Sequence, residues 1–164
     1  MSKNTLYIAY GSNINLQQMA QRCPTAKPVQ TAMLQNFELQ FKGVATIAPK
    51  ENSQVPVLLW NLKPQDERNL DKYEGCPSFY RKEIFDVKIK GKVYEAMVYI
   101  MNGNSPLSEP SEQYYNSIEK GYIDNDLDTK YLEQALEDAV LSQKNDPGEE
   151  YIYDETEGFQ MKFD

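Results

Sequence analysis

The chain has 164 residues, of which 40% are hydrophobic, and this is enough for one domain with a single core. Its 25 acidic and 17 basic residues give a net charge of -8, so the chain repels a phosphate backbone and we expect no nucleic-acid partner. Histidine is absent, which removes the commonest metal ligand and the commonest general base. We therefore expect no metal and no cofactor, and any acid–base chemistry must use other side chains, such as carboxylates.

The first predicted element is a buried strand over residues 6–10, which ends in a Gly-Ser-Asn turn before a helix over residues 14–22. The apolar run is too short for a signal peptide or a membrane span, so we expect a cytoplasmic protein with no membrane partner. The turn places backbone N–H groups where they can bind one anion, and Gly11 allows a ligand to approach the backbone. The simpler alternative is a turn in which Ser12 or Asn13 only caps the helix.

A short helix is predicted over residues 64–74, because Pro64 suits its first turn and Gly75 stops it. Glu74 falls in the last turn, at the negative end of the helix dipole. That field, together with any burial, would raise the pKa of the carboxyl and make it a better base near neutral pH. The alternative is an ordinary surface carboxylate that pairs with Arg81 or Lys82.

The remaining pattern predicts an α+β fold in one domain over residues 1–164. Strands are expected over residues 6–10, 37–41, 44–48, 55–61, 80–90 and 93–101, and later helices over 111–120 and 128–143. Because the strands and helices do not alternate regularly, we expect a mixed, strongly curved or barrel-like sheet of about six strands with flanking helices. The acidic tail over residues 145–164 carries several aromatic side chains and could dock as an extra strand.

Three sequence features occur together in this chain. Tyr10-Gly11-Ser12-Asn13 follows the first strand, Glu74-Gly75 ends the middle helix, and Pro110-Ser111 precedes Tyr114. This combination resembles the γ-glutamylcyclotransferase-like family, which includes the γ-glutamylamine cyclotransferases and the AIG2-like proteins. The resemblance spans about residues 5–140 and also implies a compact barrel with flanking helices.

The resemblance implies roles for particular residues. Glu74 would be the catalytic acid/base, and the substrate would be bound by Tyr7, Ile8, Ala9, Tyr10, Gly11, Ser12, Asn13 and Tyr114. The implied reaction converts a γ-glutamyl amino acid or amine to 5-oxoproline and the free amine. Such a substrate carries its own nucleophile, the α-amine, so neither a protein nucleophile nor a metal is required. The alternative is a non-catalytic module of the same fold that binds a γ-glutamyl compound or regulates a partner. Either protein could be a monomer or a homodimer.

Overall fold

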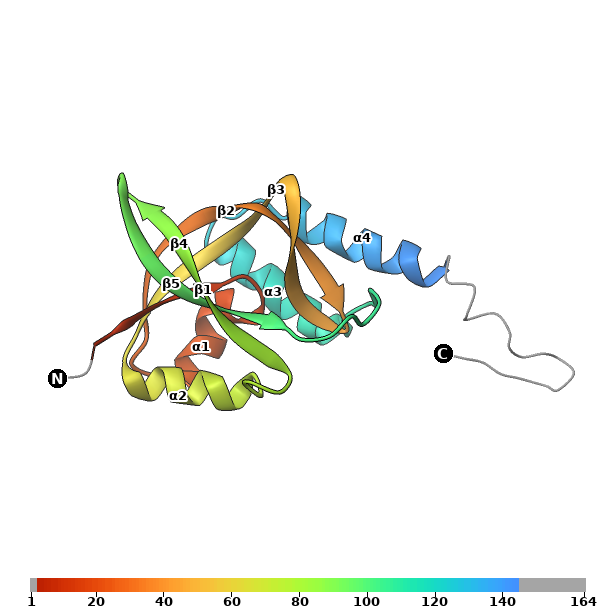
Figure 1. Cartoon of the computed structure of the whole chain (residues 1–164). Coiled ribbons are helices and arrows are strands. Elements are labelled where there is room, and N and C mark those ends of the chain that lie inside the picture. Colours follow the sequence, from red (N-terminus) through yellow and green to blue (C-terminus); the bar gives the residue numbers. More distant parts are fainter. Residues whose placement is uncertain (1–2, 145–164) are drawn as a thin grey trace, which may run out of the picture.

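The computed structural model describes residues 3–144 and is built around a five-stranded sheet in the order β2-β3-β1-β5-β4 (Figure 1). The central strand β1 (Thr5–Ala9) is antiparallel to β3 (Val44–Leu62) and parallel to β5 (Lys92–Met101). The outer strands β2 (Lys27–Lys42) and β4 (Tyr80–Ile89) pair antiparallel with β3 and β5. This mixed sheet with flanking helices confirms the predicted α+β class.

The sheet has five strands rather than about six, because the strands expected over residues 44–48 and 55–61 are one continuous strand. The polar stretch between them stays paired with β2, as in the pairs of Gln54 with Gln35 and of Pro49 with Phe37. This part of the ribbon is largely exposed, so its residues need no apolar alternation to form a strand. For the same reason β2 begins at Lys27, well before the expected residue 37.

All four predicted helices are present. They are α1 (Leu16–Arg22), α2 (Pro64–Tyr73), α3 (Glu112–Asp124) and α4 (Lys130–Lys144), and a 3-10 turn over Ser12–Ile14 precedes α1. Figure 1 shows α1 and α2 together beside the sheet, and α4 packs on β2. In α2 the side chain of Asp66 accepts a hydrogen bond from the N–H of Lys63, which satisfies one unpaired donor at the start of that helix.

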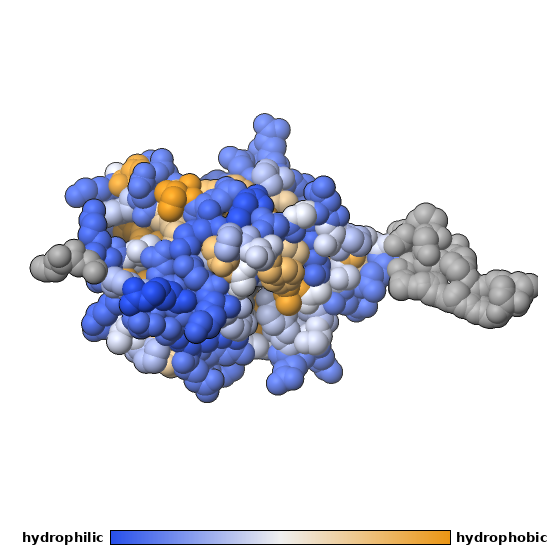
Figure 2. Space-filling model, turned by 60° about the horizontal axis from the view of Figure 1, so that its bottom comes forward, coloured by the Kyte–Doolittle hydropathy of each residue, from blue (hydrophilic) through white to orange (hydrophobic). Residues whose placement is uncertain are grey.

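The core is formed where β1, β3 and β5 cross the helices. Ile8, Leu59 and Val98 are fully buried there, and burial of each such side chain contributes roughly 1.5–3 kcal/mol. Figure 2 shows one face of the surface, which is mostly hydrophilic with separate small apolar patches. No helix within residues 3–144 is both long and apolar enough to cross a bilayer. The predicted docking of the tail at 145–164 lies outside the described residues.

Candidate active site

The loop after β1 is closed by its own backbone and by the helix that follows it. The N–H of Ile14 donates to the carbonyl of Gly11, and the N–H of Asn15 donates to that of Ser12, each at 3.0 Å. Asn15 caps α1, since its side chain accepts a hydrogen bond from the N–H of Gln18 at 3.0 Å. The alternative in which Ser12 or Asn13 caps the helix is therefore wrong, and both of these side chains make other hydrogen bonds.

Helix α3 holds the same loop from the other side. A Cβ added to Gly121 would lie 2.8 Å from the backbone of Ile14 and of Asn15, so only glycine allows α3 to pack this closely. The side chain of Asn15 donates to the carbonyl of Ser117, and that of Asn125 donates to the carbonyl of Ile14, at 2.9 and 3.2 Å. The loop is thus clamped between α1 and α3.

Asn13 uses its polar groups to fix the inner side of the loop. Its side-chain Nδ2 donates to the Tyr7 hydroxyl at 2.9 Å, and its backbone carbonyl accepts from the indole N–H of Trp60 at 3.0 Å. Within residues 3–144 the backbone N–H groups of Gly11, Ser12 and Asn13 have no protein acceptor. Adjacent free N–H groups of this kind form a cradle for an anionic oxygen.

A cavity of about 210 Å³ opens between this loop and the end of α2. Its walls are Tyr7, Tyr10, Gly11, Ser12, Asn13, Val44, Ala45, Tyr73, Glu74, Phe79, Tyr80, Tyr99 and Tyr114. The structure therefore brings the predicted loop residues, Glu74 and Tyr114 into one cavity. Ile8 and Ala9 do not line it, because their side chains are fully buried in the sheet core.

Glu74 follows the last residue of α2, and its N–H donates to the carbonyl of Leu70 at 2.8 Å. Its side chain is half-buried, and this burial raises the pKa of the carboxyl from 4.5 to about 7, while the positive charge of Arg22 opposes the shift. Neither predicted alternative partner binds it: Arg81 pairs with Glu83, and Lys82 pairs with other carboxylates of α2. Among residues 3–144 the Glu74 carboxylate has no ion-pair partner.

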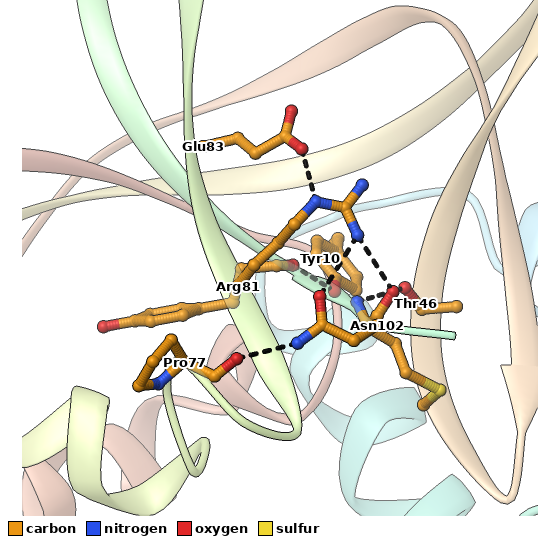
Figure 3. Close-up of polar contacts among 8 residues, drawn as sticks. Tyr10, Thr46, Pro77, Arg81, Glu83 and Asn102 are labelled. Atoms are coloured by element: carbon orange, nitrogen blue, oxygen red, sulfur yellow. Dashed lines mark hydrogen bonds and ion pairs between the residues drawn. The ribbon is translucent and has the colours of Figure 1, made fainter.

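The turn that follows Glu74 is tied to the end of β5, as Figure 3 shows. The side-chain amide of Asn102 donates to the carbonyls of Pro77 and Ser78 at 2.7 and 3.0 Å. Arg81 in turn donates to the Asn102 side chain at 3.4 Å, and its Nε pairs with Glu83. These bonds hold the exit from α2 against the sheet, so the Glu74 backbone has a fixed place beside the cavity.

The tyrosines of the cavity wall fall into two groups by the direction of their hydrogen bonds. Tyr10 donates to the carbonyl of Tyr99, Tyr80 donates to the carbonyl of Ala45 at 2.6 Å, and Tyr99 donates to Asp71, so these O–H groups are used within the wall. The oxygens of Tyr7 and Tyr114 instead accept, from the side chain of Asn13 and from the N–H of Ala45.

The O–H groups of Tyr7 and Tyr114 therefore have no acceptor among the described residues, although both residues line the cavity. Burial raises the pKa of Tyr114 to about 12, and burial followed by the nearby charge of Glu74 raises the pKa of Tyr7 as well. Both hydroxyls are thus protonated at neutral pH and can donate to a bound molecule.

Several wall residues had no predicted role, namely Val44, Ala45, Tyr73, Phe79, Tyr80 and Tyr99. Val44 and Ala45 lie just after Gly43, at the start of a strand that the sequence marks only by its apolar residues. Tyr73 and Phe79 flank the Glu74 turn and are 47% and 52% exposed, which places them at the mouth of the cavity. Their closeness to Glu74 in sequence was the signal that could have found them.

Known proteins resemble this chain in both sequence and fold. Residues 7–122 match the family model described as gamma-glutamyl cyclotransferase, AIG2-like. The human gamma-glutamylcyclotransferase is 31% identical over 79% of this chain and 76% of its own length, and the mouse protein of the same name is 30% identical over the same shares. A solved structure titled gamma-glutamyl cyclotransferase superposes with a TM-score of 0.70 at 28% identity, covering 81% of this chain and 86% of that one.

The fold and the cavity together define a small mixed-sheet protein in which the Glu74 carboxyl shares a cavity with the Gly11 loop. Within residues 3–144 this carboxyl has no ion-pair partner and the loop N–H groups have no acceptor. The chain belongs to the gamma-glutamyl cyclotransferase, AIG2-like family.

Proposed function

We propose that this protein is a cytoplasmic γ-glutamylcyclotransferase, which converts a γ-glutamyl amino acid or γ-glutamyl amine to 5-oxoproline and the free amine. The observation that carries the proposal is the position of Glu74, a half-buried carboxyl without an ion-pair partner among residues 3–144, in the cavity that the Gly11 loop closes. A carboxyl with a pKa of about 7 is well suited to take and return a proton at neutral pH.

In the proposed reaction the α-amine of the substrate attacks its own γ-carbonyl carbon. Glu74 removes a proton from the α-ammonium group, the C–N bond of the five-membered ring forms, and the bond to the leaving amine breaks. The same carboxyl gives this proton to the leaving nitrogen as the bond breaks, and a second proton passes from the ring nitrogen to the departing amine by the same route. The products are then the lactam N–H of 5-oxoproline and the free amine in its ammonium form, and Glu74 ends in the state in which it began. A folded substrate supplies the proximity that a bimolecular attack would lack, and effective molarities of well-oriented intramolecular reactions reach about 10⁵–10⁸ M.

The loop can hold the charged end of such a substrate without a basic side chain. The free N–H groups of Gly11, Ser12 and Asn13 suit the α-carboxylate, since adjacent backbone donors bind anionic oxygens. The unused O–H groups of Tyr7 and Tyr114 face the same cavity and suit the negative charge that develops on the γ-carbonyl oxygen. Ile8 and Ala9 would contribute only by holding the strand that ends in this loop.

A panel of γ-glutamyl amino acids and γ-glutamyl amines, each incubated with the purified protein, tests the proposal when 5-oxoproline is measured by mass spectrometry. We expect release from at least one member, and nearly complete loss of release in Glu74→Gln. The matched control is Glu137→Gln, which removes an exposed carboxylate on α4 and should leave release unchanged. Binding of γ-glutamyl compounds by wild-type protein without any 5-oxoproline after hours would contradict the enzyme and favour the binding module.

A further inference from the structure

Arg22 contacts both walls of the cavity although it does not line it. Its Nη1 donates to the side-chain oxygens of Ser12 and Asn13, at 3.1 and 2.5 Å. The centre of its guanidinium also lies 3.8 Å from the centre of the Tyr73 ring, and Tyr73 directly precedes Glu74. One planar cation thus connects the loop that follows β1 to the helix end that presents the carboxyl.

The backbone of Arg22 is also fixed. It is the last residue of α1, and its carbonyl accepts a hydrogen bond from the side chain of Asn69 on α2 at 3.0 Å. A positive charge at a helix C-terminus is favoured by the helix dipole. The side chain therefore extends from a point that is already tied to α2, which limits how far the guanidinium can move from its three contacts.

The contact with Asn13 sets the direction of the hydrogen bonds beyond it. A guanidinium can only donate, so the amide oxygen of Asn13 must face Arg22, and its Nδ2 must face the Tyr7 hydroxyl. The Tyr7 oxygen consequently accepts, and its own O–H is directed away from Asn13 toward the cavity that it lines. Without Arg22 the amide of Asn13 could turn over, and Tyr7 would then donate to it instead.

We propose that Arg22 is a positioning residue, which holds Asn13 and Tyr73 so that the Tyr7 hydroxyl donates into the cavity and the Glu74 carboxyl keeps its place opposite the loop. The effect of Arg22 on turnover rests on the proposed function, whereas its role in holding Asn13 and Tyr73 in place does not depend on that function. No contact between Arg22 and the substrate is required.

The charge of Arg22 has a second effect, on the proton affinity of Glu74. The titratable groups that line the cavity with this carboxyl or interact with its charge are Tyr7 on β1, Tyr10 directly after that strand, Tyr73 and Cys76 at the end of α2 and beyond it, Tyr80 on β4, Tyr99 on β5 and Tyr114 on α3. Arg22 is the charge that lowers the pKa of Glu74, against the larger effect of burial. Removal of this cation should therefore move the pKa of Glu74 further upward.

Two substitutions separate the geometry from the charge. Arg22→Met removes both, and we expect kcat for 5-oxoproline release to fall about 10- to 100-fold with a smaller change in KM, because misplaced catalytic groups cost turnover. In this variant the acidic limb of the profile of kcat/KM against pH should move to higher pH. Arg22→Lys keeps the charge but loses the planar fork, so the limb should stay near that of the wild type while kcat recovers only in part. Arg68→Met, an exposed arginine on α2, is the matched control.

A measurement that does not need turnover keeps this inference separate from the proposed function. The titration of the Glu74 carboxyl, followed by ¹³C NMR, should have a higher midpoint in Arg22→Met than in wild type, and the loop amides of residues 11–13 should exchange with solvent faster. If the wild type releases no 5-oxoproline, the proposed function fails while this test still decides the role of Arg22. An unchanged midpoint together with unchanged amide exchange in Arg22→Met would overturn the positioning role of Arg22. If Arg22→Met does not fold, Arg22→Lys replaces it, and an amide exchange rate equal to that of the wild type would overturn the role.

Discussion

Asp71 and Glu74 lie one turn apart at the end of α2, yet their surroundings differ. Asp71 accepts a hydrogen bond from Tyr99 and pairs with Lys82, which also pairs with Glu67. Glu74 has no such partner among residues 3–144 and faces a cavity instead. One cation on β4 therefore neutralises Glu67 and Asp71 of the helix, while Glu74 at its end has no ion-pair partner among the described residues. The comparison teaches that position relative to Lys82, rather than residue type, separates a structural acid from a candidate base.

The largest effect should come from exchanging the two acids for their amides. Glu74→Gln should lower kcat for 5-oxoproline release by roughly 10² to 10⁴, because the proton shuttle is lost while the shape is kept. Asp71→Asn keeps an oxygen for the Tyr99 hydroxyl and should cost less than tenfold in kcat, since it lies in the ion-pair cluster. Steady-state kinetics of both variants measure these two changes in kcat. A larger loss in Asp71→Asn than in Glu74→Gln would reverse the assignment.

The second largest effect on kcat should come from Tyr7 and Tyr114, which line the same cavity as Glu74. Tyr114→Phe and Tyr7→Phe each remove an O–H that has no acceptor within residues 3–144, and we expect kcat to fall about 10- to 100-fold. Each substitution also leaves a buried donor, the N–H of Ala45 or the side-chain amide of Asn13, without its acceptor, so it should cost roughly 1–3 kcal/mol of unfolding free energy.

Tyr80→Phe is the matched control for that pair of substitutions. It leaves the buried carbonyl of Ala45 without its 2.6 Å hydrogen bond, so it should cost a similar unfolding free energy, roughly 1–3 kcal/mol, but it should change kcat little because this O–H is used within the wall. Urea unfolding checks that the three variants lose similar stability, and steady-state kinetics then show whether kcat falls only in Tyr7→Phe and Tyr114→Phe. Full activity in both Tyr7→Phe and Tyr114→Phe would show that the rings, and not the hydroxyls, are what the cavity needs.

The third effect is on stability, and its sign follows from the raised pKa of Glu74. Below pH 4.5 the carboxyl is protonated in both the folded and the unfolded chain and has no effect. Between 4.5 and about 7 the folded chain holds the proton more tightly, so stability falls as pH rises and stays lower above that range. At pH 8 we expect Glu74→Gln to be more stable than wild type by about 1–3 kcal/mol. Urea unfolding at pH 4 and pH 8 measures this, and an equal difference at both values would contradict it.

The smallest effect should come from the mouth of the cavity. Phe79 is half-exposed and lies beside the Glu74 turn, where the leaving amine of a substrate would emerge. Phe79→Ala should raise KM for substrates with a large apolar amine by about two- to fivefold, with kcat nearly unchanged, because only part of one aromatic side chain is covered on binding. The same KM ratio for small and large amines would mean that Phe79 does not contact that group.

The sequence predicted those parts of the molecule that local patterns determine. The apolar run before Gly11 and the helical signals from Pro64 to Gly75 placed both the loop and Glu74, because each depends on a few neighbouring residues. The continuous strand β3 was missed, since its polar middle lies on an exposed ribbon and carries no alternation.

The role of Arg22 was missed for a different reason. Its contacts reach Asn13, Tyr73 and Asn69, and their spacing along the chain follows neither the helical nor the strand period. Only the packing of α1 against α2 brings these residues together. The same holds for Lys82, whose pairing with α2 depends on the position of β4 beside that helix.

The pH dependence of kcat/KM in the wild-type protein tests the central claim most directly, because it reports the ionisation of the essential base in the free enzyme. We predict an acidic limb with a midpoint near the pKa of about 7 that burial gives Glu74, with activity rising as the carboxyl loses its proton. A midpoint near the ordinary value of 4.5, or activity that does not change across this range, would show that Glu74 is not the base.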